Sequence, residues 1–305
     1  MALLKTGSTH CHFNKVFGDV ESLIKLKECG FDSCDFALNS YQREDAFDRV
    51  EEDYILMKSD AEMKEYFTSL KKVADDIGLE IGQVHAPYHF CPAENFFRDD
   101  FIKCYQNAVK ATAFLGSKDL VVHPIVLPDP ENNYKKNLKM NAEFYGSLRS
   151  VMKEYGVRVS VENMDAINPL KKSGVPSTVS SAEKVLDLLD LLGDGYCACL
   201  DTGHAFLAGQ EPGHMAKLLG DKLGTLHIHD GDGYDDLHIP PMTGYIKWEQ
   251  FFKALADIDY KGYVNIEIDY LRFGRDKEVM LSLGRFMNTL ARNFAQKIED
   301  YKKQF

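Results

Sequence analysis

The chain has 305 residues, 45% of them hydrophobic, which is enough to bury a substantial core in one large domain or two ordinary ones. Its formal net charge of -11 argues against a general attraction to nucleic acid or to an anionic membrane surface. No basic region precedes a long apolar stretch at the N-terminus, and no apolar run reaches the roughly 18 residues of a membrane span, so a soluble, unprocessed cytoplasmic protein is expected.

Short apolar or β-branched runs alternate along the chain with longer amphipathic stretches. The short runs predict strands at Leu3–Gly7, Ser33–Ala37, Ile81–His85, Leu120–His123, Arg158–Glu162, Tyr196–Asp201, Gly224–His229 and Tyr263–Ile268. The longer stretches predict helices at Val20–Cys29, Ala61–Ile77, Phe96–Leu115, Tyr134–Tyr155, Ala182–Leu192, His214–Leu219, Trp248–Ala256 and Lys277–Tyr301. Eight strands alternating with eight helices predict an α/β fold, a (β/α)8 TIM barrel that forms a single domain over residues 1–305.

Local signals mark several of the predicted helix ends. Ser180 and Glu183 have the spacing of a capping box before the run AEKVLDLLDLL. Glycines stand where helices should stop, at Gly30, Gly78, Gly116, Gly156 and Gly193. The one long connection, Asn39–Asp60, follows the second strand and is either a lid over the substrate or a solvated acidic loop with a short helix.

The cysteines indicate a reducing compartment. There are seven, an odd number without a CxxC pair, and several lie in apolar runs where cysteine behaves as a small hydrophobe. We expect reduced thiols in a cytosolic protein. Cys11 lies between His10 and His12, but a soft thiolate beside many carboxylates would be an unusual ligand mixture, so we do not assign it to a metal site.

Nine side chains that can bind metal stand at or just beyond the ends of six separate apolar runs. They are His85, His123, Glu162, Asp201, His204, His227, Asp236, His238 and Glu267. In a (β/α)8 barrel the C-terminal ends of the strands face one common mouth. The nine residues therefore predict a single site, with a divalent metal as the expected occupant.

Glu162 and Asp201 are the strongest candidates among the nine. Each is embedded in an apolar run, VSVENM or CACLD, where an unpaired carboxylate is costly to bury. A metal or a cationic partner removes that cost. Neither run contains a cation, and Arg158 lies at the opposite end of its strand from Glu162, so a metal is the better interpretation.

The ligand types allow one to three metal ions in the chain. Imidazoles mixed with carboxylates suit zinc, manganese, cobalt, iron or magnesium better than calcium. The expected central ligands are Glu162, Asp201, His227 and Glu267. His85 and His123 could join Glu162 around a second ion, and His204, Asp236 and His238 could bind a third.

The chain resembles the xylose-isomerase-like TIM barrels, a superfamily of sugar isomerases, ketose 3-epimerases and endonuclease IV-type apurinic-site nucleases. The resemblance extends from the first strand to Glu267 and is most specific in the segments VHAPY, VENM, CLDTGHAFLAG and LHIHDGDGYDDLHIPPMTGYIKW. It implies, for the epimerase branch, one metal bound by Glu162, Asp201, His227 and Glu267. It also implies that the two glutamates are the catalytic groups that move protons next to a carbonyl and that His204 contacts the substrate.

The nuclease branch uses three metals, and all nine of its ligand types have a counterpart here. However, its Asp-Arg-His element is replaced by Asp236-Leu237-His238, and HIPPMTGYIKW resembles the shorter loop of the sugar isomerases. The acidic composition also lacks the Lys and Arg supply that phosphate-backbone contacts need. The resemblance therefore favours a sugar, sugar phosphate or related polyol as substrate over nucleic acid, with the abasic-site hydrolase as the alternative and a metal-containing sugar-binding protein without turnover as a third class.

Other residues near the mouth receive supporting assignments. His85, His123 and Tyr88 are candidates for substrate contacts, while His229 and Asp230 are candidates for supporting the metal ligands. Arg272 and Arg275 could reach a substrate phosphate, although solvated charges at a helix entry are the favoured interpretation. Homo-oligomers are common among barrels of this resemblance, and the sequence leaves the oligomeric state open.

Overall fold

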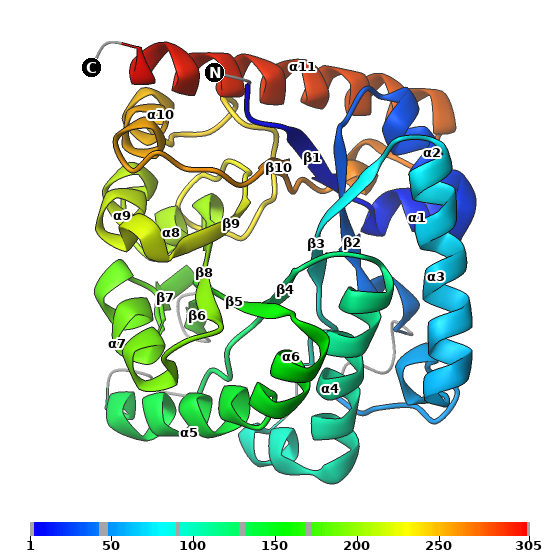
Figure 1. Cartoon of the computed structure of the whole chain (residues 1–305). Coiled ribbons are helices and arrows are strands. Elements are labelled where there is room, and N and C mark those ends of the chain that lie inside the picture. Colours follow the sequence, from blue (N-terminus) through cyan, green and yellow to red (C-terminus); the bar gives the residue numbers. More distant parts are fainter. Residues whose placement is uncertain are drawn as a thin grey trace.

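The computed structural model describes residues 3–42, 48–89, 92–127, 132–168, 173–177 and 179–303. Eight parallel strands form one sheet in the order β10-β1-β2-β3-β4-β5-β8-β9. The strands are Thr6–Thr9 (β1), Ser33–Ala37 (β2), Glu80–His85 (β3), Asp119–Val122 (β4), Arg158–Glu162 (β5), Tyr196–Asp201 (β8), Leu223–His227 (β9) and Val264–Ile266 (β10). A parallel bridge between Ile228 and Ile266 joins the two ends of the sheet, with Ile228 N–H donating to the Asn265 carbonyl at 2.9 Å. The predicted single-domain (β/α)8 barrel is therefore confirmed (Figure 1).

Helices surround the strands on the outside of the barrel (Figure 1). They are Cys11–Phe17 (α1), Asp19–Glu28 (α2), Asp60–Asp76 (α3), Asp99–Phe114 (α4), Tyr134–Gly146 (α5), Arg149–Tyr155 (α6), Ala182–Leu192 (α7), Thr202–Leu207 (α8), Pro212–Leu219 (α9), Trp248–Asp257 (α10) and Lys277–Lys302 (α11). Short 3-10 turns lie at Leu38–Tyr41, Ile55–Met57, Ala93–Phe97, Gly220–Lys222 and Tyr270–Phe273. The five glycines predicted to stop helices all have positive φ, between 67° and 95°, a backbone conformation that glycine adopts more easily than other residues.

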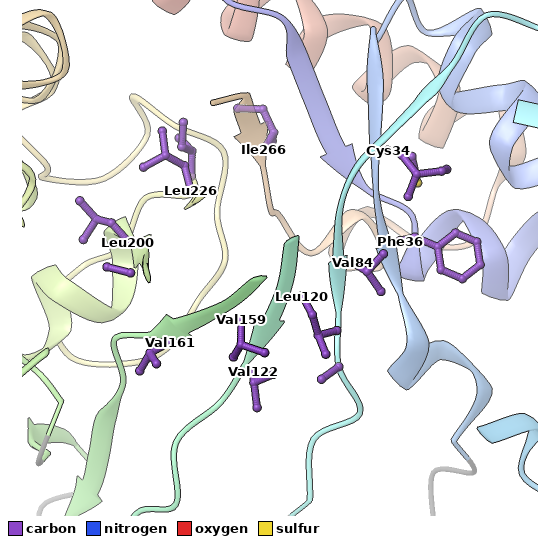
Figure 2. Packing of buried hydrophobic residues seen from close by; sticks show 14 of the residues in the cluster. Cys34, Phe36, Val84, Leu120, Val122, Val159, Val161, Leu200, Leu226 and Ile266 are labelled. Atoms are coloured by element: carbon purple, nitrogen blue, oxygen red, sulfur yellow. The ribbon is translucent and has the colours of Figure 1, made fainter. Parts of the chain in front are cut away.

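The two faces of the strands differ in chemistry. On β2, Cys34 and Phe36 belong to the apolar core that the strands form with the helices, and Figure 2 shows them with apolar side chains of other strands. Asp35, between them, points the other way and contacts residues of β3, β9 and β10 inside the barrel. This alternation follows from the two-residue period of a strand. The outer face therefore supplies hydrophobic stability, while the interior is free to hold polar groups.

Two predicted elements differ from the structure in position or continuity. The first strand begins at Thr6 instead of Leu3, because Thr6, Gly7 and Ser8 make the register with β10. The predicted helix at Tyr134–Tyr155 is two helices, α5 and α6. At their junction Leu148 N–H bonds to the Tyr145 carbonyl, an i to i−3 pattern that tightens the turn and redirects the chain.

The N-cap of α7 is also one residue later than predicted. Ser181, not Ser180, accepts the hydrogen bond from the backbone N–H of Lys184. The Ser180 hydroxyl donates instead to the Ser177 carbonyl at 2.8 Å. The capping-box prediction failed because two adjacent serines, Ser180 and Ser181, offer the same local chemistry, and only the path of the loop selects one.

Several short elements were not predicted. Helices α1 and α8 have seven and six residues, too few for a clear apolar period. An antiparallel hairpin of Asp165–Asn168 (β6) and Ser173–Pro176 (β7) follows β5. In the long connection after β2, residues 43–47 lie outside the described part of the chain, so the proposed lid stays a prediction; beyond it the Tyr54 hydroxyl bonds to the Leu38 carbonyl.

The described cysteines and helices agree with two further predictions. Six cysteines are free thiols, and Cys91 lies outside the described residues. Within the described part of the chain, no helix combines the length and the apolar composition that crossing a bilayer requires.

His10, at the end of β1, should make the stability of the fold depend on pH. Its buried ring accepts a hydrogen bond from Ala37 N–H through Nδ1 and stacks on Phe36, and burial lowers its pKa to about 4. Because the unfolded chain takes up this proton at about 6.5, the stabilisation is complete above pH 6.5 and is lost as the pH falls toward 4, by about 3 kcal/mol. The free energy of unfolding should therefore fall between pH 7.5 and pH 4.5 in the wild type. In His10→Asn, whose side-chain oxygen can replace the Nδ1 acceptor, that fall should be smaller by about 3 kcal/mol. Equal pH dependence in both proteins would contradict the assignment.

Candidate metal centre and active site

The barrel brings all nine predicted ligands to the C-terminal ends of its strands. His85, Glu162, Asp201 and His227 are the last residues of β3, β5, β8 and β9, while His123 and Glu267 follow β4 and β10 directly. His204 lies in α8, and Asp236 and His238 lie in the loop after β9. Among the described residues, three groups have one potential ligand atom from each member within 4.8 Å of all the others.

The first group contains the four central ligands. Glu162, Asp201, His227 and Glu267 place their ligand atoms within 4.8 Å of one another. His227 Nδ1 lies 3.2 Å from Glu162 Oε1 and 3.1 Å from Glu267 Oε2. Glu162 is 1% exposed, whereas the Glu267 side chain retains 17% exposure and reaches the mouth. The two glutamates therefore flank the His227 imidazole: Glu162 lies on the enclosed side and Glu267 on the side open to the mouth.

The second group lies on the other side of Glu162. His85 Nε2 and His123 Nε2 are 3.5 Å and 3.2 Å from Glu162 Oε2. Ligand atoms of His85, Glu162 and His227 lie within 4.8 Å of one another, and His123 stands outside this group. The ring of Tyr88 stacks on His123 at 5.5 Å between centroids and forms part of the wall here. The structure thus brings both histidines to Glu162 and puts Tyr88 beside them.

The third group is an outer cluster of His204, His229, Asp236 and His238. Asp236, whose side chain is 44% exposed, lies 3.4 Å from His204 Nε2 and 3.2 Å from His238 Nε2. His229 stacks on His238 at 3.9 Å between centroids, and its Nε2 is 2.9 Å from Asp201 Oδ1. Sequence reasoning treated His229 as a support only, but its position also makes it a candidate ligand of this cluster.

Three of the six imidazoles are tied to the backbone through the ring nitrogen that faces away from the carboxylates. Nδ1 of His85 is 2.7 Å from the Ala86 carbonyl, and Nδ1 of His229 and His238 are each 3.2 Å from the carbonyls of Asp230 and Glu267. A carbonyl only accepts, so these contacts place the proton on Nδ1 and leave Nε2 with a lone pair. This is the arrangement in which proteins present histidine to a metal.

The charges at the site show why a cation fits it. Burial alone would raise the pKa of Glu162, but His227 and His123 outweigh it and hold that pKa well below its usual range. Burial would lower the pKa of His204, yet Asp201 and Asp236 raise it well above 6.5. In the metal-free protein, protons on buried imidazoles thus balance the carboxylates.

Three potential ligand atoms of Glu162 and His227 also lack hydrogen bonds. Both Glu162 oxygens and His227 Nδ1 are buried and make no hydrogen bond within the described structure, although oppositely charged atoms lie within 3.5 Å. Buried polar atoms without partners are costly and rare. A divalent ion at this point would satisfy these atoms and replace the protons, so the residues present fit a metal site.

Beneath the central ligands lies a polar layer that sequence reasoning missed. Asp35 Oδ2 accepts hydrogen bonds from Gln83 Nε2 and Asn265 Nδ2, both at 3.1 Å, and lies 3.0 Å from His227 Nε2. The signal was present, because Asp35 interrupts the apolar run SCDFA just as Glu162 and Asp201 interrupt theirs. It was overlooked because Asp35 lies inside its strand and not at the end.

The structure refines one supporting prediction and agrees with another. The support predicted from Asp230 comes from its backbone: its carbonyl lies 3.2 Å from Nδ1 of His229, a candidate ligand of the outer cluster. The Asp230 carboxylate has another role. It accepts hydrogen bonds from Trp248 Nε1 at 2.9 Å and from the Gly231 and Ile246 backbones, and so holds the loop between β9 and α10. Arg272 is exposed and bonds to the Leu237 carbonyl at 3.3 Å, in agreement with a solvated charge.

Known proteins similar to this chain have the same barrel fold. A sequence model of one family, described as Xylose isomerase-like TIM barrel, matches residues 23–288. An uncharacterized protein of Methanocaldococcus jannaschii is 28% identical over 218 residues, which cover 69% of this chain and 72% of the relative. A D-tagatose 3-epimerase-like protein superposes with a TM-score of 0.72 at 21% identity, over 97% of this chain and 99% of its own. D-Psicose 3-epimerase from Clostridium cellulolyticum H10, solved with D-tagatose, has a TM-score of 0.68 at 19% identity, over 96% and 99% of the two chains. At these identities the structural likeness shows the fold alone.

Proposed function

Because the chain belongs to the xylose isomerase-like TIM barrel family, we propose that it is a metal-dependent isomerase or epimerase of a sugar, sugar phosphate or related polyol. The reaction would pass through an enediolate. Support comes from structural neighbours named as ketose 3-epimerases, one of them solved with a ketose. The substrate would be a small carbohydrate, and nucleic acid and membranes are not expected partners.

One observation carries the proposal. Two glutamates, an aspartate and a histidine from four different strands meet within 4.8 Å at the mouth of the barrel. One glutamate, Glu267, is open to the mouth, while Glu162 is enclosed. Two carboxylates in such different surroundings are suited to different parts of a proton transfer.

The chain's own residues would then act as follows. A divalent metal bound by Glu162, Asp201, His227 and Glu267 would supply Lewis-acid stabilisation of negative charge on substrate oxygens. One of the two glutamates removes the proton from the carbon next to the carbonyl, and the other returns a proton to the same or the opposite face. His204 orients a substrate hydroxyl, and Tyr88 with His123 provides a wall that excludes water.

Proton exchange tests this function directly. Purified protein is incubated in deuterated water with a panel of ketoses and ketose phosphates and with manganese, cobalt or zinc. We expect metal-dependent deuterium incorporation at a carbon next to the carbonyl of at least one substrate. If no substrate exchanges a proton while the protein holds metal, proton-transfer chemistry at this site is wrong.

The alternative is hydrolysis of a phosphodiester at an abasic site. The outer cluster favours it, because His204, Asp236 and His238 are assembled beside the central ligands, as a multinuclear site requires. Leu237 in place of arginine and the net charge of -11 count against it. Cleavage of an abasic duplex that chelator abolishes would favour the hydrolase. Tight sugar binding with neither reaction would indicate a metal-containing binding protein.

A further inference from the structure

His227 is held in a different way from the other imidazoles of the site. The rings of His85, His229 and His238 are tied to backbone carbonyls, which are fixed and uncharged. The His227 ring nitrogen that faces away from the two glutamates, Nε2, lies 3.0 Å from the carboxylate of Asp35 on β2, which β10 and β1 separate from β9. Both side chains are fully enclosed, with 0% side-chain exposure.

We propose that Asp35 is a positioning residue that prepares His227 to bind the metal through Nδ1. A carboxylate oxygen only accepts, so it keeps the proton on Nε2 and leaves the lone pair of Nδ1 aimed between Glu162 and Glu267. The negative charge behind the ring also makes Nδ1 a stronger donor to a cation. This inference rests on the metal-binding part of the proposed function and does not depend on the sugar chemistry.

The surroundings of Asp35 support a role beyond packing. Three N–H groups, from Gln83, Asn265 and His227, converge on the single oxygen Oδ2. Two neutral amides hold the carboxylate in place, and among the described residues its one ion-pair partner is the His227 ring itself. A buried carboxylate is costly unless a positive charge compensates it. A metal on the far side of the His227 ring would provide that charge, and the interaction would stabilise both the ion and Asp35.

The neighbouring amides provide a matched control. Gln83 contacts the same oxygen of Asp35 and is equally buried, and the hydrogen bonds described for its side chain go to Asp35 and to the Leu226 carbonyl, not to a central ligand. Gln83→Leu removes a polar group from the same layer and should destabilise the fold to a similar degree as Asp35→Asn. Only Asp35→Asn removes the charge behind His227.

The experiment measures metal binding to the full-length protein without substrate. Zinc and cobalt affinities are determined by competition with a chromophoric chelator for wild type, Asp35→Asn and Gln83→Leu, with unfolding curves for each. We expect Asp35→Asn to bind the same number of ions about 10–100-fold more weakly, with a changed cobalt absorption spectrum, and Gln83→Leu to bind like wild type. Equal affinity in Asp35→Asn, or an equal loss in Gln83→Leu, would reduce Asp35 to a structural role.

A second measurement uses the wild type alone, in case the variants do not fold. The ring ¹⁵N spectrum of the zinc-loaded protein should show His227 protonated at Nε2 and metal-bound at Nδ1. The opposite tautomer, or a wild-type protein that binds no metal, overturns the inference. Asp35-dependent metal binding without any proton exchange on sugars would leave the inference standing and would contradict only the proposed function.

Discussion

Glu162→Gln should abolish both tight metal binding and metal-dependent proton exchange, with a rate loss of roughly 10²–10⁴-fold. The Glu162 carboxylate lies within 3.5 Å of ring nitrogens of His85, His123, His204 and His227, so the central site and the site on its other side both depend on its charge. Glutamine has nearly the same shape but carries no charge and presents an amide N–H₂ that cannot bind a cation. The metal-free variant should also be less stable than the wild type, because the change removes the carboxylate that compensates the buried imidazoles, although it opens no cavity. Unfolding curves therefore check that the variant is folded under the assay conditions.

The measurement combines metal analysis with the deuterium assay. Glu143→Gln is the matched control, because Glu143 is exposed on α5, where its pairing partner is Lys139. The control should bind metal and exchange protons like wild type. Exchange at the wild-type rate in Glu162→Gln would show that the chemistry takes place elsewhere.

Glu267→Gln should separate proton transfer from metal binding. Among the described residues the Glu267 carboxylate pairs with a single imidazole, that of His227, and it reaches the mouth, where a substrate would approach. We therefore expect exchange to fall by roughly 10²–10⁴-fold, while metal affinity falls less than in Glu162→Gln. A loss confined to metal affinity, with the rate fully restored at saturating metal, would show that Glu267 is a ligand and not a proton-transfer group.

Asp236→Asn, compared with Glu267→Gln, distinguishes the epimerase from the multinuclear hydrolase. Asp236 is also at the mouth, but it contacts His204 and His238 of the outer cluster and not the central four. If the protein is an epimerase, Asp236→Asn should keep most of the proton-exchange rate. Its metal content should fall only if the outer cluster binds an ion. Loss of abasic-site cleavage in Asp236→Asn, with no sugar exchange in wild type, would establish the multinuclear alternative.

The order of strands and helices was largely readable from the sequence. Apolar runs such as VSVENM and CACLD marked strand ends well, because a barrel strand is covered on its outer face by helices and shows little polar alternation there. The first strand, TGST, was misplaced because its side chains are small and polar. Its position depends on pairing with β10, which lies more than 250 residues away in sequence.

The sequence by itself determined that the chain would form a barrel and that nine metal-binding side chains would end or follow its strands. A parallel barrel has only one C-terminal mouth, so residues at strand ends must share it. Only the tertiary structure decided which of them meet. It placed Glu162 among four imidazoles, added His229 to the outer cluster and turned the Asp230 carboxylate away from the site toward Trp248. It also put Asp35 behind His227 across 192 positions of the chain, because contacts inside a closed barrel depend on register and strand order, which no local pattern encodes.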